Sequence, residues 1–110
     1  MAFYLFTANY SRDAMQAMVK SPSDREAAAR KIIEAAGGKL HHMFMAFGPT
    51  DVIAICEFPD DIGMAAVSLA VGSAGGVTNA ATTKLLTPTE FGEAMRKASA
   101  IASSYTPPQG

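Results

Sequence analysis

The two histidines of the chain are the first candidates for chemistry, because they are consecutive in the segment 39–47, which is predicted as a strand. Neighbouring side chains on a strand point to opposite faces, so we expect one histidine on each face of the sheet. The face of His41 would continue with Met43 and Met45. An imidazole and two thioethers are soft ligands of the kind that bind Cu(I), but methionines also pack adaptably at subunit interfaces. No second His or Cys motif accompanies them, so the pattern favours packing over a metal centre.

His42 would share the other face with Leu40 and Phe44. A histidine among apolar neighbours is usually a hydrogen-bonded core or rim residue. Its functional alternatives are a general base or a haem ligand in a cavity lined by the sheet. His42 is therefore a candidate ligand-binding residue, and the sequence assigns neither a specific cofactor nor a catalytic residue.

Two charged residues stand at positions where a partner is expected. Asp51 ends a predicted hairpin turn, where a carboxylate normally accepts hydrogen bonds from the turn backbone, and the alternative is a carboxylate at the mouth of a cavity. Arg25 lies in the first turn of a predicted helix, which is unfavourable for a cation because the helix dipole is positive there. This placement predicts either a salt bridge to Asp60 or Asp61, which we favour, or an anionic ligand.

Polar side chains also occur on strands that are otherwise apolar or rich in threonine. These further candidates for orienting a small molecule, for which satisfied packing is the alternative, are Tyr4, Tyr10, Asn79 and Thr83. The single cysteine, Cys56, lies in mid-strand, where a thiol is most often inert packing. It cannot form an internal disulfide, which indicates a reducing compartment.

Charge and hydropathy exclude several classes of function. Nine Lys and Arg oppose ten Asp and Glu without a basic run, so we expect no nucleic-acid binding. The segment 1–10 lacks the pattern of a signal peptide. The longest apolar stretch, 62–74, is too short to span a bilayer. We therefore expect a cytoplasmic protein without a membrane partner.

The elements that must position these residues follow the order β-α-β-β-α-β-α. The predicted strands cover 3–10, 39–47, 52–58 and 77–86. Capping boxes are predicted at Ser23 to Glu26 and at Thr87 to Glu90. This order is typical of an α+β, ferredoxin-like βαββαβ sandwich with a four-stranded antiparallel sheet and an added C-terminal helix. We expect one domain over 1–103 and a tail over 104–110.

The first three strands are apolar at both parities, as shown by Phe3 and Leu5 against Tyr4 and Phe6 in the first of them. In an antiparallel sheet with one solvent-exposed face, each strand would instead alternate between apolar and polar residues. The second face must therefore be covered, most simply by another copy of the chain. We expect a homo-oligomer, at least a dimer.

With these elements placed, the chain resembles the GYD-domain family, small bacterial and archaeal proteins largely of unassigned function. The matching segments are Asn9-Tyr10-Ser11, Asp24 to Ala27, Ala36 to Leu40, the turn from Gly48 to Asp51, Glu57 to Asp61, and Thr82 to Thr87. Thr50 stands where the Gly-x-Tyr-Asp turn of the family has its tyrosine. The resemblance implies the fold and the assembly, and it implies no particular activity.

Two functions of different classes are consistent with these features of the sequence. One is an oligomeric module for small-molecule binding or assembly. The other is a cofactor-independent or haem-assisted oxidoreductase, by analogy with other dimeric ferredoxin-like proteins. A cavity lined by a histidine and few other polar groups would favour the oxidoreductase.

Overall fold

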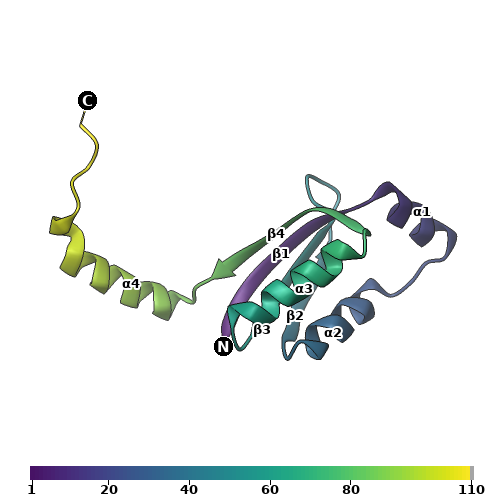
Figure 1. Ribbon diagram of the computed structural model, residues 1–110, viewed down its shortest axis with the longest axis horizontal. Helices are drawn as coiled ribbons and strands as arrows, with labels where there is room; N and C mark the ends of the chain where they lie inside the picture. The colour runs from purple at the N-terminus through teal and green to yellow at the C-terminus, as the bar shows by residue number, and fades with distance from the viewer. Residues whose placement is uncertain (110) are drawn as a thin grey trace.

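The computed structural model describes residues 1–109 and contains one sheet and four α-helices (Figure 1). In chain order the elements are β1 (Ala2–Tyr10), α1 (Arg12–Lys20), α2 (Arg25–Ala35), β2 (Lys39–Met45), β3 (Val52–Phe58), α3 (Asp61–Ser73), β4 (Val77–Leu85), α4 (Pro88–Ile101) and a short 3-10 turn, η1 (Ala102–Ser104). Gly110, the end of the predicted tail, lies outside the described residues.

The four strands form one antiparallel sheet in the order β2-β3-β1-β4. Helices α2 and α3 lie on one face of it, and α1 lies beyond its end (Figure 1). This is the predicted ferredoxin-like arrangement, and the α+β class is confirmed. We call the covered side the helix face and the other side, which carries Phe3, Leu5, Ile53 and Ile55, the open face.

The core lies between the helix face and helices α2 and α3. Its buried members are Tyr4, Ile33, Leu40, Ala54, Cys56, Phe58, Met64 and Val67. Phe58 is fully buried, and two glycines approach its ring so closely that a side chain on either would collide with it. A Cβ added at Gly63 would lie 2.9 Å from Cδ1 of Phe58. The absence of side chains at Gly38 and Gly63 therefore sets how closely the helices approach the sheet.

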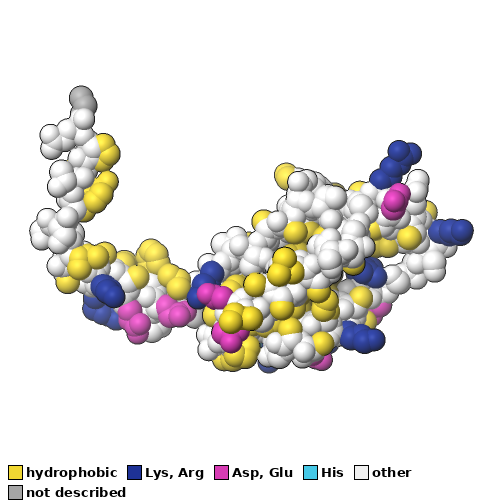
Figure 2. Space-filling view, in the orientation of Figure 1, with side chains coloured by type: hydrophobic (Ala, Val, Ile, Leu, Met, Phe, Trp, Pro, Cys, Tyr) yellow, Lys and Arg dark blue, Asp and Glu magenta, His cyan; other side chains and the backbone are white. Residues whose placement is uncertain are grey.

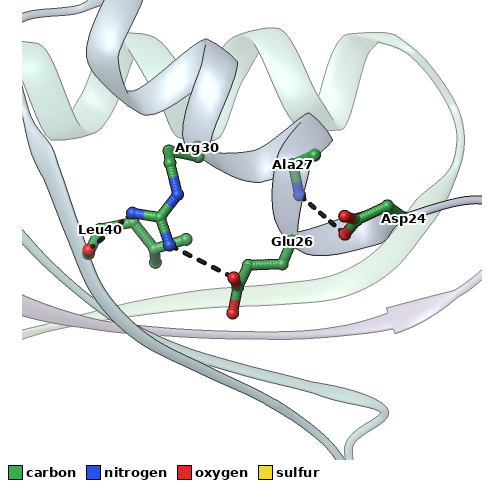
Figure 3. Close-up of polar contacts among 5 residues, drawn as sticks. All are labelled: Asp24, Glu26, Ala27, Arg30 and Leu40. Atoms are coloured by element: carbon green, nitrogen blue, oxygen red, sulfur yellow. Dashed lines mark hydrogen bonds and ion pairs between the residues drawn. The ribbon is translucent and has the colours of Figure 1, made fainter.

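At the start of each α-helix a side-chain oxygen accepts a hydrogen bond from a backbone N–H group. Ser11 caps α1 and Asp60 caps α3, and the capping box predicted for Thr87 and Glu90 is confirmed. For α2 the prediction is wrong by one residue: Asp24, and not Ser23, accepts the N–H of Ala27 at 3.0 Å (Figure 3). The carboxylate of Asp24 caps as well as a serine hydroxyl does and adds negative charge at the positive end of the helix dipole.

Arg30 on α2 connects this helix to the edge strand β2 through a hydrogen bond. Arg30 Nη1 donates to the carbonyl oxygen of Leu40 at 3.2 Å, while its Nη2 pairs with Oε2 of Glu26 at 3.3 Å (Figure 3). The guanidinium thus supplies a donor to a backbone carbonyl of an edge strand, where no neighbouring strand follows.

Helix α3 is apolar on most of its circumference, so its periodicity predicts its buried face poorly. Helical spacing would place Ile62 and Leu69 on one apolar face, yet these side chains are 78% and 74% exposed. Met64 and Val67 are buried instead. The close approach of Gly63 to Phe58 agrees with this orientation, because Gly63 and Met64 are neighbours on the side of α3 that faces the sheet.

Helix α4 projects away from the sheet, and none of its side chains is buried (Figures 1 and 2). Its apolar residues Phe91, Met95 and Ile101 are each more than half exposed. Isolated helices of this length are marginal in water. Among residues 1–109, no helix has the length and apolarity to cross a membrane.

We expect Gly38→Ala to destabilise the fold, because its Cβ would lie 2.4 Å from Cε1 of Phe58 and 2.8 Å from the carbonyl oxygen of Glu57. Overpacking of this kind lowers the free energy of unfolding by about 1–3 kcal/mol. Gly48→Ala is the matched control, since a Cβ there meets nothing within 4 Å. Urea denaturation should separate the two variants, and equal midpoints would contradict the assignment of Gly38 as a packing contact.

Candidate functional site

A cavity of about 540 Å³ lies between the sheet and the three helices α1, α2 and α3. Its floor includes Phe6, Met43 and Val52 from the strands, and its walls include Ala28 from α2 and Ala70 from α3. Small residues such as Ala28 and Ala70 stand in this lining beside larger apolar side chains such as Ile32. The volume is within the range of pockets that enclose small molecules, roughly 300–1,000 Å³.

The most deeply buried part of the lining contains two sulfur atoms. The thiol of Cys56 donates to Sδ of Met64 at 3.5 Å, and both side chains are almost completely buried. Burial raises the pKa of the Cys56 thiol to about 11. The thiol therefore stays protonated near neutral pH, where it packs as an apolar group and is a poor nucleophile.

Polar groups of the lining gather where α1 ends and α2 begins. Ser21, Ser23 and Arg25 contribute to the cavity there, and all three residues are exposed, so they form its rim. Arg25 is the one charged side chain in the described lining. Its Nη1 donates to Oγ of Ser23 at 3.4 Å.

The favoured salt bridge of Arg25 is wrong, because both predicted carboxylates are engaged elsewhere. Asp60 accepts the N–H of Gly63 at 3.0 Å as the cap of α3. Asp61 pairs with Nζ of Lys84 at 3.0 Å. In residues 1–109, Arg25 has no carboxylate within ion-pair distance.

Tyr4 belongs to a polar cluster at the start of α3, outside the cavity. Its hydroxyl donates to Oδ1 of Asp61 at 2.5 Å, and the same oxygen contacts Lys84. The hydrogen bond to the Asp61 carboxylate, together with burial, raises the pKa of Tyr4 to about 12. The hydrogen bonds from Tyr4 and Lys84 lower the pKa of Asp61. The cluster joins α3 to β1 and β4. Sequence analysis missed Asp61 as a Tyr4 partner and did not consider Lys84, which the register places opposite Tyr4.

Both histidines lie on the open face, so the prediction of one on each face is wrong. A β-bulge between Leu40 and His42 inserts an extra residue into β2. His41 Nε2 lies 2.9 Å from Oε1 of Glu57, and its ring centroid is 5.3 Å from that of Phe3. His42 is opposite Ile55, a residue of the same face. Neither histidine borders the cavity.

The same bulge separates His41 from the two methionines of the proposed soft-ligand row. Met43 is opposite Ala54 and packs against the core, on the helix face. Met45 is opposite the buried Val52. The row of His41, Met43 and Met45 is therefore not formed. The described residues contain no group of three or more His, Cys, Asp or Glu with the spacing of a metal site.

Asp51 ties the β2–β3 hairpin to the end of β1. Its Oδ2 accepts the N–H of Tyr10 at 2.9 Å, and its own N–H donates to the carbonyl oxygen of Ala8 at 3.0 Å. The N–H also lies 3.1 Å from Oδ1 of Asn9. These bonds lead to β1 and not to the turn backbone that the sequence suggested, and Asp51 is not part of the cavity lining.

The two candidates on β4 are also outside the cavity. Asn79 has a φ of 51° at an irregularity in the pairing of β1 with β4. Thr83 is exposed opposite Leu5 on the open face. Of the ligand-binding candidates, the structure thus places Arg25 at the cavity, where Tyr10 also contributes, and disperses the others.

The family model described as GYD domain matches residues 4–95 of the 110-residue chain. The matched region begins in β1 and ends in α4, so it contains every strand and helix that forms the cavity. Neither a curated protein nor a solved structure matches the chain.

We expect one of the three tyrosines to ionise only near pH 12 in the folded protein. Because this pKa lies above the ordinary value of 10.0, the contribution of Tyr4 to stability is complete below pH 10 and is lost as the pH rises toward 12. Absorbance titration at 295 nm should show the late step. Tyr4→Phe should remove it, and Asp61→Asn should move it to lower pH. A late step that survives Tyr4→Phe would contradict the assignment.

Proposed function

The chain belongs to the GYD domain family, and we propose that it is a cytoplasmic binding module that holds a small molecule in the cavity between its sheet and helices. The observation that carries the proposal is the cavity itself, about 540 Å³ of mostly apolar space with its polar groups gathered at one rim. Sites of this construction bind ligands by burying apolar surface and orient them with a few polar contacts.

The chemistry of the lining supports binding over catalysis. The oxidoreductase alternative relied on a histidine beside a cavity, and His41 and His42 lie on the opposite side of the sheet. Cys56 lies in the lining, but its pKa of about 11 keeps the thiol protonated near neutral pH. The guanidinium of Arg25 offers several hydrogen-bond donors and no acceptor. These groups can hold and orient a ligand, and the thiol is a poor nucleophile near neutral pH.

The open face supports assembly into a homo-oligomer. Phe3, Leu5, Ile53 and Ile55 are partly exposed there, and in residues 1–109 no helix packs over them. Phe44, at the β2 edge of this face, is 65% exposed. A contiguous apolar surface of this kind marks an interface. A second copy is the occupant that we propose, because the same apolar face on each copy makes the contact self-complementary.

Binding in the cavity can be tested with the neutral fluorophore N-phenyl-1-naphthylamine, whose emission rises in apolar surroundings. We expect saturable binding to the full chain. Ala28→Phe, in the lining, should weaken it about tenfold, which corresponds to ~1.4 kcal/mol. Ala27→Phe is the matched control on the outer face of the same helix, where Ala27 lines a shallow depression instead. Absence of saturable binding, or equal effects of the two substitutions, would refute a ligand site in this cavity.

Assembly can be tested by light scattering coupled to size-exclusion chromatography. We expect at least twice the chain mass of 11.5 kDa. Ile55→Asp should dissociate the oligomer, because it places a charge in the open face, and Phe44→Asp should act in the same direction at a more exposed position. Ala66→Asp, on the exposed side of α3, is the control and should leave the mass unchanged. A monomeric wild-type protein, or dissociation by the control substitution alone, would refute assembly through the open face.

A further inference from the structure

We propose that the ligand of the cavity is an amphiphile with a carboxylate head, bound by Arg25 at the rim, and an apolar body that extends over the floor. This inference rests on the proposed function, because it assigns a chemical class to the molecule held in that site. Its first support is charge: Arg25 is the one charged side chain of the described lining, so the rim has a positive charge without a facing acidic group.

The acidic neighbours of Arg25 in the sequence do not neutralise it from the lining. Asp24 accepts the N–H of Ala27 as the cap of α2, and Glu26 pairs with Arg30 (Figure 3). Both carboxylates belong to the shallow depression on the outer surface of α2. Arg25 itself donates to Ser23 at 3.4 Å, a long bond that leaves most of the five donors of the guanidinium free.

The position of Arg25 also points to an anionic partner. It lies in the first turn of α2, where the positive end of the helix dipole disfavours a cation. The two carboxylates that would compensate for this placement are held by the start of α3 and by Lys84. A bound anion at the rim would supply the missing negative charge.

The planar guanidinium of Arg25 favours a carboxylate as the head group of the ligand. Its parallel N–H donors match the two oxygens of a carboxylate in a bidentate pair. The hydroxyls of Ser21 and Ser23 lie on the same rim and add neutral donors. One guanidinium balances the single charge of a carboxylate, whereas a phosphate dianion would retain an excess of negative charge.

The apolar floor of the cavity favours an apolar body in the ligand. Phe6, Met43 and Val67 line the space beyond the rim, and the flexible methionine can adjust to an alkyl chain or a ring. The described lining contains no acidic side chain, so nothing in it repels the head group or requires a cationic ligand.

The test is displacement of N-phenyl-1-naphthylamine by decanoate, decanol and decyl phosphate, each kept below its micellar concentration at pH 8. We expect decanoate to displace the fluorophore at about tenfold lower concentration than decanol, the preference that one charge-assisted hydrogen-bond pair provides. Arg25→Gln should abolish this preference without changing displacement by decanol. Arg96→Gln, on α4 and outside the lining, should preserve it. Circular dichroism shows whether each variant is folded.

The outcomes separate the two proposals. Equal displacement by decanoate and decanol, or a preference that survives Arg25→Gln, would overturn the carboxylate head and leave the binding module intact. Stronger displacement by decyl phosphate than by decanoate, with the same dependence on Arg25, would replace the carboxylate by a phosphate and so overturn the assignment. No displacement by any of the three, together with no saturable binding of the fluorophore, would overturn the proposed function itself.

Discussion

The packing of α2 and α3 against a single face of the sheet is the constraint on which the rest of the molecule depends. Phe58 is enclosed at the centre of this contact, and Gly38 and Gly63 permit the close approach of the backbone around it. Because strand side chains alternate between faces, covering one face leaves the other without a layer. The cavity lies along the same contact and is open to solvent at one side, where Ala28 and Ala70 are exposed.

A single bulge in β2 determines where the chemically versatile side chains lie. One extra residue between Leu40 and His42 places both histidines on the open face and turns Met43 toward the core. His41 then pairs with Glu57 beside Phe3 on the open face. The cavity on the helix face is left with a thiol whose pKa is raised, a few hydroxyls and Arg25. This division of groups between the two faces explains why the geometry supports binding in the cavity and assembly on the opposite side.

Helix α4 carries a second exposed apolar surface, in addition to the open face of the sheet. Its N-terminus is well defined by the capping box of Thr87 and Glu90, yet Phe91 and Met95 remain more than half exposed. A helix that is well capped but has no buried side chain is stabilised by its ends and not by packing. In an assembled state the apolar side of α4 would be available to a neighbouring copy, in the same way as the open face. The domain boundary predicted at residue 103 falls just beyond this helix, within η1.

The sequence alone determined the four strands, the antiparallel α+β class and the start of the last helix at Thr87, because these depend on local patterns of apolar residues and capping side chains. It predicted one helix between the first two strands, where the structure has both α1 and α2. It also singled out Arg25 as a cation in need of a partner, from its place in the first turn of a helix. The tertiary structure decided that this partner is absent. Asp60 caps α3 through a local bond to Gly63, and Asp61 contacts Tyr4 and Lys84, which are distant from it in the sequence. The tertiary structure also decided the faces of His41 and His42 and the rotation of α3. A bulge reverses the alternation of a strand without any local signal, and a helix that is apolar all round takes its orientation from the surface that it packs against.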